Sequence, residues 1–336
     1  MTKMSDVYWN PMMGLIQVAT AFMDATSATP AWPPKCLSLA LQGGGSFGAF
    51  TWGVLDRLLE EHDVRFDAIS GSSAGAVNAV LLASGMIKGR AEAKAKLARF
   101  WKRMSDSASF LPMTALASAT MGDGFSDFAS ALLPYQFNPF DLNPLREALA
   151  AEIDFKRLRA QSPMKLLIAA TRVRDGELRI FREAELSVET VLASACLPLI
   201  HRTIEVDSEP YWDGGYVANP PLIPLVQASD AANILVVQVT PAKSDRLPKT
   251  QREIVKRLDQ INFNSTLNAE IEALKVGMSV GATPKLRRLH IDRISAQDEF
   301  EGLADENAAN LGWSFLESLR ESGRNAAEAW IAQRAA

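Results

Sequence analysis

The chain has 336 residues, of which 48% are hydrophobic and 22% charged, and its formal net charge is -4. This balance is ordinary for a globular protein and excludes disordered and collagen-like classes. The small negative charge gives no reason to expect nucleic acid as a partner. The two cysteines, Cys36 and Cys196, lie far apart and outside any C-x-x-C pattern, which argues against a disulfide scaffold and a zinc site. We expect a cytoplasmic protein without metal or cofactor.

The first 34 residues combine an apolar segment with a proline-rich linker. Residues 11–23 are apolar, but Asp24 follows at once. The run is too short to span a bilayer, and it lacks the basic start and cleavage site of a secretory signal. Asn10 followed by Pro11 favours a short helix, whose apolar face must be covered by protein or by lipid.

From residue 35 onward, short apolar runs alternate with helical periods. Residues 37–41 are predicted to form a buried strand that leads into a helix, and residues 66–70 a second strand that leads into a helix from Ser73. This series predicts an α/β fold with a mainly parallel sheet and helices packed on it. Because no repeat or low-complexity linker follows, we expect one domain over residues 35–336.

The later segments continue the α/β pattern. Residues 88–104 indicate a helix rich in Lys and Arg, and residues 105–140 an irregular apolar insertion of the kind that is often functional. A helix restarts at Asn143-Pro144. The remaining predictions are a strand at 164–173, a two-residue turn at Asp175-Gly176, a returning strand at 177–182, strands at 233–240 and 285–291, and helices at 251–276 and 306–332.

The most informative stretch is Gly71-Ser72-Ser73-Ala74-Gly75, between the second strand and its helix. It fits G-x-S-x-G, in which small residues allow a strained turn that lifts a serine hydroxyl above the sheet edge. The register makes Ser73 the candidate nucleophile. Backbone N–H groups at the start of the helix favour a developing anion at the same place. The pattern indicates acyl transfer, and the alternative is that the small residues only permit close packing.

A glycine loop, Gly43-Gly44-Gly45-Ser46-Phe47-Gly48, joins the first strand to its helix. It satisfies G-x-G-x-x-G, but the second strand has no carboxylate at its end for a ribose, because Asp67 stands at its start. The Lys and Ser or Thr of a phosphate loop are missing as well. We interpret the loop as backbone N–H groups at the same sheet edge as Ser73, where they would converge on the oxygen of an attacked carbonyl.

A serine nucleophile needs a base, and four residues are candidates. His62 ends the first helix and reads as a surface residue, whereas His201 and His290 are of a kind that is more often packed than catalytic. Asp213 lies in Tyr211-Trp212-Asp213-Gly214-Gly215, where its simplest interpretation is a turn aspartate. With its usual pKa of about 3.9 an Asp is a poor base at neutral pH, but burial beside aromatic side chains would raise that pKa.

Three ordered motifs resemble those of the patatin-like phospholipase family. They are the glycine loop at 43–48, the elbow at 71–75 and the triplet Asp213-Gly214-Gly215. Residues 191–198 also resemble the A-S-x-A-x-P segment common in that family, so the likeness covers roughly residues 35–240. The chain departs from the pattern at Phe47, where many members carry Lys or Arg.

The resemblance implies a three-layer α/β/α fold and acyl hydrolysis of lipids, with a lipid or fatty-acyl ester as substrate. It implies a dyad of Ser73 as nucleophile and Asp213 as base, without histidine. The oxyanion hole it implies is formed at Gly43, Gly44 and Gly45, and the remaining motif glycines are Gly48, Gly71, Gly75, Gly214 and Gly215.

Other hypotheses stay open at this point. One is a serine esterase with a triad that uses His201 or His290, and another is a catalytically idle lipid-binding protein. Three features are candidates for contact with a lipid surface: the apolar residues 11–23, the basic helix at 88–103 and the insertion at 105–140. The alternative for these features is packing on the core and ordinary solvation.

Overall fold

A computed structural model of the chain describes residues 33–109, 143–198, 201–300 and 302–332. The apolar segment at 11–23 and most of the insertion at 105–140 lie outside the described residues. An eight-stranded sheet has the order β5-β6-β3-β2-β1-β7-β8, with β4 paired to β3. The strands are β1 (Cys36–Leu41), β2 (Arg65–Gly71), β3 (Lys165–Arg172), β4 (Leu178–Arg182), β5 (Ile204–Val206), β6 (Glu209–Asp213), β7 (Asn233–Gln238) and β8 (His290–Ser295).

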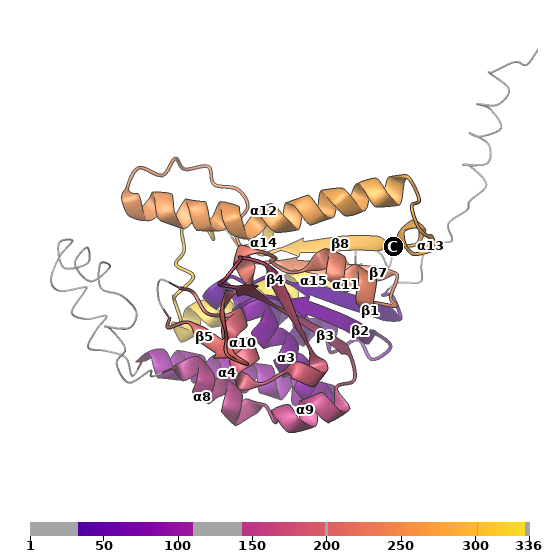
Figure 1. Cartoon of the computed structure of the whole chain (residues 1–336), viewed down its shortest axis with the longest axis horizontal. Helices are drawn as coiled ribbons and strands as arrows, with labels where there is room; N and C mark the ends of the chain where they lie inside the picture. The colour runs from indigo at the N-terminus through magenta and orange to yellow at the C-terminus, as the bar shows by residue number, and fades with distance from the viewer. Residues whose placement is uncertain (1–32, 110–142, 199–200, 301, 333–336) are drawn as a thin grey trace, which may run out of the picture.

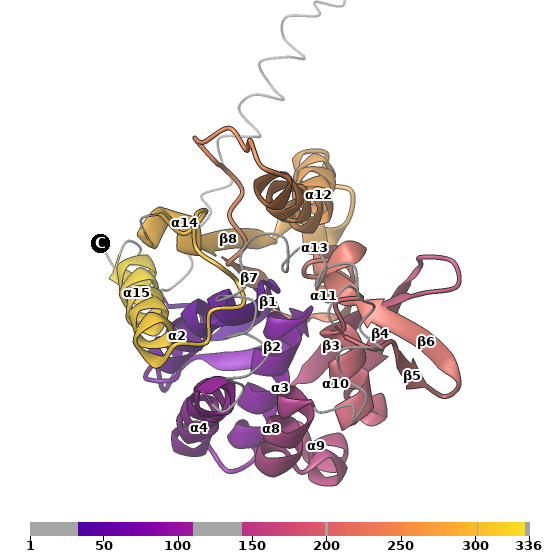
Figure 2. The same cartoon turned by 90° about the vertical axis from the view of Figure 1, so that its left-hand side faces the viewer.

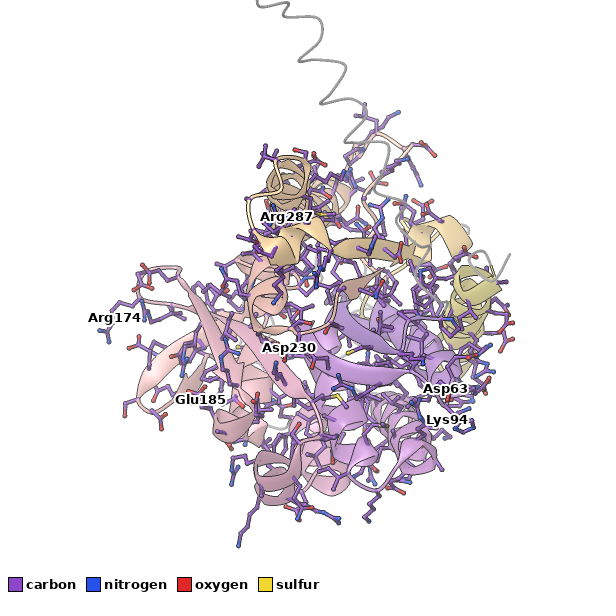
Figure 3. All side chains as sticks on the ribbon, turned by 90° about the vertical axis from the view of Figure 1, so that its right-hand side faces the viewer. Asp63, Lys94, Arg174, Glu185, Asp230 and Arg287 are labelled. Atoms are coloured by element: carbon purple, nitrogen blue, oxygen red, sulfur yellow. The ribbon has the colours of Figure 1, made fainter. Side chains whose placement is uncertain are left out.

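The central strands β3, β2, β1, β7 and β8 are parallel, whereas β4 and β6 run antiparallel to β3. Parallel neighbours bring their carboxyl ends to one edge of the sheet, so the loops after β1, β2 and β7 lie together. Figure 2 looks onto this carboxyl edge, and Figure 3 onto the opposite amino edge, with Asp230 at its centre.

Helices cover both faces of the sheet (Figure 1). One face carries α2 (Gly48–Leu58), α3 (Ala74–Met86), α4 (Arg90–Ser109), α8 (Pro144–Glu152), α9 (Phe155–Gln161), α10 (Val188–Ser194) and α15 (Trp313–Ala332). The other carries α11 (Leu222–Ala228), α12 (Gln251–Ser279) and α13 (Pro284–Arg287). The short elements are η1 (Gly45–Phe47), η2 (Glu183–Glu185), η3 (Gly214–Tyr216) and α14 (Ala296–Glu299).

Alternation along the strands divides the hydrophobic core in two. In β1, Leu39 and Leu41 pack into the cluster that includes α2 and α3, whereas Ala40 faces α11 and α12. In β7, Val237 and Val236 divide in the same way. Successive side chains along a strand point to opposite faces of the sheet, and here both sets are buried, as expected for strands covered on both faces. The predicted α/β/α fold with a mainly parallel sheet is confirmed.

Two predicted elements are wrong in their bounds. The strand expected at 285–291 begins only at His290, because Thr283 caps α13 by accepting the Leu286 N–H and Pro284 fits the first helical position. The helix expected at 306–332 begins at Trp313. Asn307 and Asn310 accept the N–H groups of Ala309 and Gly312, local bonds that compete with a helix.

The hairpin from β3 to β4 is confirmed, but its loop is longer than the predicted two-residue turn. The Arg172 N–H donates to the Glu177 carbonyl, so residues 173–176 form the loop. Asp175 holds it closed by accepting bonds from the Arg172 guanidinium and from the Glu177 N–H. An ion pair that reaches across the loop thus replaces the tight turn.

Candidate active site

Ser73 lies at the sharp turn between β2 and α3, in a strained backbone conformation with φ 53° and ψ -125°. Among the described residues, the other two non-glycine residues with positive φ are Asp207 and Ser208, which form the turn between β5 and β6. A left-handed serine is costly, and such strain is characteristic of a nucleophile elbow.

The motif glycines let backbones approach closely around this turn. A Cβ on Gly75 would lie 2.0 Å from the Leu41 carbonyl oxygen, and one on Gly71 would lie 2.6 Å from the backbone of Gly75. A Cβ on Gly214 would lie 2.2 Å from the Ala169 carbonyl oxygen, whereas at Gly48 and Gly215 it would meet side-chain atoms at 2.7 and 3.0 Å.

Backbone hydrogen bonds hold Ser73 in place, and its side chain lines a pocket. Its N–H donates to both the carbonyl oxygen and the Oγ of Ser194, each at 3.1 Å. The neighbouring Ser72 is fully buried, and its hydroxyl donates to the Ala218 carbonyl. Of the two adjacent serines, only Ser73 lines the pocket, which supports the predicted register.

Asp213 ends β6 and is completely buried. Its N–H donates to the Cys196 carbonyl, its carbonyl accepts the Thr171 hydroxyl, and its Oδ1 accepts the Gly215 N–H at 2.7 Å. Its Oδ2 has no hydrogen-bond partner among the described residues. The backbone is thus fixed while one carboxylate oxygen stays bare.

Burial raises the pKa of the Asp213 carboxyl from 3.8 to about 7, although the Gly215 N–H and the nearby Ser73 hydroxyl both act to lower it. The Ser73 hydroxyl is therefore close enough to influence the carboxyl, without the geometry of a formed hydrogen bond. Such bonds are often loose in a free enzyme and tighten around substrate. A carboxyl with a pKa near 7 is suited to take and return a proton at neutral pH.

The glycine loop provides two backbone N–H groups beside Ser73. The Gly43 N–H donates to Asn219 Oδ1 at 2.7 Å, so it does not act as an oxyanion donor in this conformation, contrary to the prediction. Gly44 and Gly45 line the pocket, and among the described residues their N–H groups make no hydrogen bond. A Cβ at Gly43 would lie 2.7 Å from Ser73 Cβ, so this glycine brings the loop against the nucleophile.

A buried network of amide side chains, which the sequence analysis did not identify, holds the glycine loop. Gln42 accepts the N–H groups of Val239 and Thr240 and donates to Asn264 on α12. Asn219 donates back to the Gly43 carbonyl, which also accepts the Thr240 hydroxyl at 2.8 Å. Fully bonded buried networks of this kind favour a single rigid conformation.

The pocket beside Ser73 has a volume of about 360 Å³ and a mainly apolar wall. Phe47, Leu197, Tyr216 and Phe263 supply much of this wall. Phe263 comes from α12, and the segment Glu306–Ala309 closes another side. The chain beyond residue 240, which carries no recognisable motif, therefore forms a large part of the pocket.

Comparisons with known proteins identify the family of the chain. The family profile described as patatin-like phospholipase matches residues 39–226, more than half of the chain. The chain belongs to the patatin-like phospholipase family. Among curated proteins none matches the sequence.

Solved structures that this chain is similar to include VipD from Legionella pneumophila, at 16% identity and a TM-score of 0.39, covering 86% of this chain and 67% of VipD. ExoU from Pseudomonas aeruginosa, in its heterodimeric complex with SpcU, matches at 17% identity and a TM-score of 0.41 over 90% of this chain. The chain spans about half, 52%, of the ExoU chain.

The three histidines of this family member lie at different points of the fold. His62 is exposed after α2. His290 starts β8 at the amino edge, opposite to the edge that carries Ser73. His201 is exposed, and its Nδ1 accepts the Leu197 N–H. Within the described part of the chain, none of the three makes a hydrogen bond to Ser73 or Asp213.

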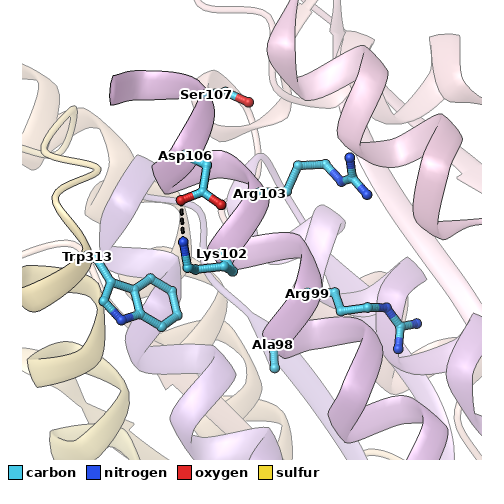
Figure 4. A pocket seen from close by; sticks show the side chains of 7 residues that line it. All are labelled: Ala98, Arg99, Lys102, Arg103, Asp106, Ser107 and Trp313. Carbon is cyan, nitrogen blue, oxygen red and sulfur yellow. Dashed lines mark hydrogen bonds and ion pairs between the residues drawn. The ribbon is translucent and has the colours of Figure 1, made fainter. Parts of the chain in front are cut away.

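The predicted basic helix is α4, and its cations are paired within the protein. Arg99 binds Glu92 and Glu152, each at 3.0 Å, and Arg103 lies 3.6 Å from Glu152. These arginines line a concave region of about 660 Å³. In this region Lys102 binds Asp106 and lies over the Trp313 ring (Figure 4). The region does not include Ser73, and the internal pairing weakens the predicted lipid contact of α4.

In the described ranges no helix is long and apolar enough to cross a membrane.

Proposed function

We propose that the chain hydrolyses fatty-acyl esters of lipids through an acyl-enzyme formed on Ser73, with Asp213 as the base. Membership of the patatin-like phospholipase family supports lipid acyl hydrolysis. One observation carries the assignment to these residues: a strained, pocket-facing serine lies near a buried carboxylate that has one bare oxygen and a pKa of about 7.

In the first half-reaction, the Ser73 oxygen attacks the ester carbonyl carbon while Asp213 takes the hydroxyl proton. The resulting oxyanion accepts hydrogen bonds from the Gly44 and Gly45 N–H groups, helped by the positive end of α3. Collapse of this intermediate breaks the bond to the leaving alcohol, which takes the proton back from Asp213.

In the second half-reaction, water attacks the acyl-enzyme and Asp213 accepts a proton from that water. The same N–H groups stabilise the second oxyanion, and the fatty acid leaves as Ser73 recovers its proton. No histidine takes part. The bare Oδ2 of Asp213 is the atom assigned to carry the proton in both halves.

The pocket wall supports an acyl chain as the group that is bound. Its aromatic and aliphatic side chains, which include Phe47, Leu197 and Phe263, offer an apolar surface, and Ser73 supplies a reactive hydroxyl in the same pocket. Such a division favours a substrate with one long apolar part and a single reactive carbonyl.

Covalent labelling with a fluorophosphonate, followed by mass spectrometry of the adduct, tests this assignment. We expect one adduct, on Ser73, together with hydrolysis of a soluble short-chain ester. Ser73→Ala should lose both. The matched control is Ser72→Ala, which removes the adjacent serine hydroxyl and should still be labelled at Ser73.

Three outcomes would contradict the proposal. Labelling at another residue would move the nucleophile, and a folded wild-type chain that is not labelled and binds lipid without hydrolysis would support the idle lipid-binding protein. Loss of labelling in a folded His201→Gln or His290→Gln variant would support a triad.

A further inference from the structure

The first half of α12 presents apolar side chains to solvent. Ile254, Leu258 and Ile261 are 44 to 53% exposed, and Val255 beside them is 44% exposed. The spacing of four and three residues places Ile254, Leu258 and Ile261 on one stripe of the helix. Figure 1 shows α12 along the outside of the molecule.

This stripe is not the side by which α12 packs on the protein. The buried side carries Gln260, Asn264, Leu267 and Leu274, which repeat at intervals of three, four and seven. Between residues 254 and 265, the strongly exposed residues away from that side are Ile254, Val255, Leu258, Asp259, Ile261, Asn262 and Ser265, of which one, Asp259, is charged. A helix face that only meets water normally carries charged residues, so this one is unusual.

Basic residues are in excess in the segment that carries the apolar stripe and in the loop before it. Residues 243–261 contain six Lys or Arg against three Asp or Glu, although the chain as a whole has a net charge of -4. The loop before α12 adds Leu247, which is 74% exposed. Its neighbour Arg246 lies 3.6 Å from Glu253, whereas Lys243 and Lys249 in the same loop are exposed to solvent. Exposed apolar side chains bordered by cations are the pattern of a helix that lies in a membrane interface.

The stripe continues into the mouth of the catalytic pocket. Val255 connects the two, because it is exposed beside the stripe and also lines the pocket. Lys256, Asp259 and Phe263 line the pocket from the same helix. A surface pressed against this side of α12 would therefore lie beside the opening above Ser73.

We propose that the outer face of α12 and the loop 243–250 dock onto an anionic lipid bilayer and set the pocket mouth against it. The inference rests on the proposed function, which gives the protein a reason to approach lipid. The site itself is argued from the apolar stripe, the basic residues near it and their continuity with the pocket. Lipid is favoured over a protein partner because cations around an apolar stripe complement anionic headgroups over acyl chains.

Sedimentation with vesicles tests the docking on the Ser73→Ala protein, which removes turnover from the measurement. The vesicles are phosphatidylcholine alone or with phosphatidylglycerol. Ile254→Ser with Leu258→Ser should lower partitioning onto the mixed vesicles on the order of tenfold or more. The matched control is Val276→Ser with Val280→Ser, which removes two exposed valines from the far end of α12 and should change little.

Charge is tested separately with Lys243→Glu and Lys249→Glu. This variant should bind mixed vesicles more weakly, most clearly at low salt, and should bind phosphatidylcholine alone as the parent does. In the Ser73 background, all of these variants should hydrolyse the soluble ester normally while the two stripe substitutions impair vesicle hydrolysis.

Equal vesicle binding by the stripe variant and its control would overturn the proposal. A large fall in melting temperature in the stripe variant would show that the face is covered by the chain itself, and a parent dimer that becomes monomeric would assign it to a second copy. Docking without ester hydrolysis by the Ser73 protein would contradict the proposed function and leave the docking in place.

Discussion

Asp56 and Asp213 are both buried carboxylates, and their surroundings differ sharply. Asp56 on α2 accepts bonds of 2.6 Å from Arg320 and from Arg324 on α15, and Lys94 on α4 lies 3.3 Å away. Lys94 is labelled on the amino-edge view in Figure 3. Among the described residues, the Asp213 carboxylate has one partner, an N–H at 2.7 Å from its Oδ1, and its Oδ2 has none.

The difference separates a structural carboxylate from a reactive one. Cations from two helices surround Asp56, so its charge connects α2, α4 and α15. In the part of the chain that the structure describes, no cation lies beside Asp213, and its burial raises the pKa of its carboxyl to about 7. An incomplete environment of this kind reduces stability in return for chemistry, a trade known from active sites.

The largest expected effect comes from Asp213→Asn. Hydrolysis should fall by about 10³-fold or more, because the amide keeps the shape but cannot accept the proton.

The same variant tests stability. Folding raises the pKa of the Asp213 carboxyl from 3.8 to about 7, so this group stabilises the fold fully below pH 3.8 and loses that contribution as pH rises through 7. The variant should therefore melt higher than the parent above pH 7. An active or strongly destabilised variant would remove the distinction between the two aspartates.

The next effect is expected from Asp56→Asn, which is the opposite case. Loss of the charge that three cations share should reduce the free energy of unfolding by about 1 to 3 kcal/mol at pH 7, as measured by urea denaturation. The rate of ester hydrolysis per folded molecule should be unchanged. A rate loss as large as that of Asp213→Asn would show that Asp56 is not merely structural.

A smaller effect is expected from Asn219→Ala, which frees the Gly43 N–H and carbonyl that Asn219 holds. Looser positioning of the glycine loop should lower kcat by about tenfold to 10²-fold with little change in KM. Asn233→Ala, at the amino edge, is the control for loss of a partly buried amide. If the two variants have equal kcat, the loop does not depend on Asn219.

The elements around the site were accessible from the sequence because their signals are local. The apolar runs of β1 and β2, each followed by small residues, indicate parallel strands whose loops share one edge, and that edge carries Ser73. The elbow needs only five consecutive residues. Local patterns failed at residues 283–290, where the Thr283 cap and Pro284 start a helix before the strand.

The supports of the site could not be read in this way because they act across long sequence separations. Asn219 is 176 residues from Gly43, and Asn264 is 222 residues from Gln42. Asn219 lies near Asp213-Gly214-Gly215 in the sequence, and Ser194 lies in the segment that resembles the family motif. Their positions indicated that they are close to the site, but not which groups they bind. That Asn219 accepts the Gly43 N–H could be seen only in the folded structure.

The central claim is that Asp213 activates Ser73, and the pH dependence of fluorophosphonate labelling at Ser73 tests it most directly. In the parent the labelling rate should rise with pH and level off above an apparent pKa of about 7, because the base acts only when its carboxyl is ionised. In Asp213→Asn the rate should be low and should lack this rise. An unchanged pH profile in the variant would contradict the account.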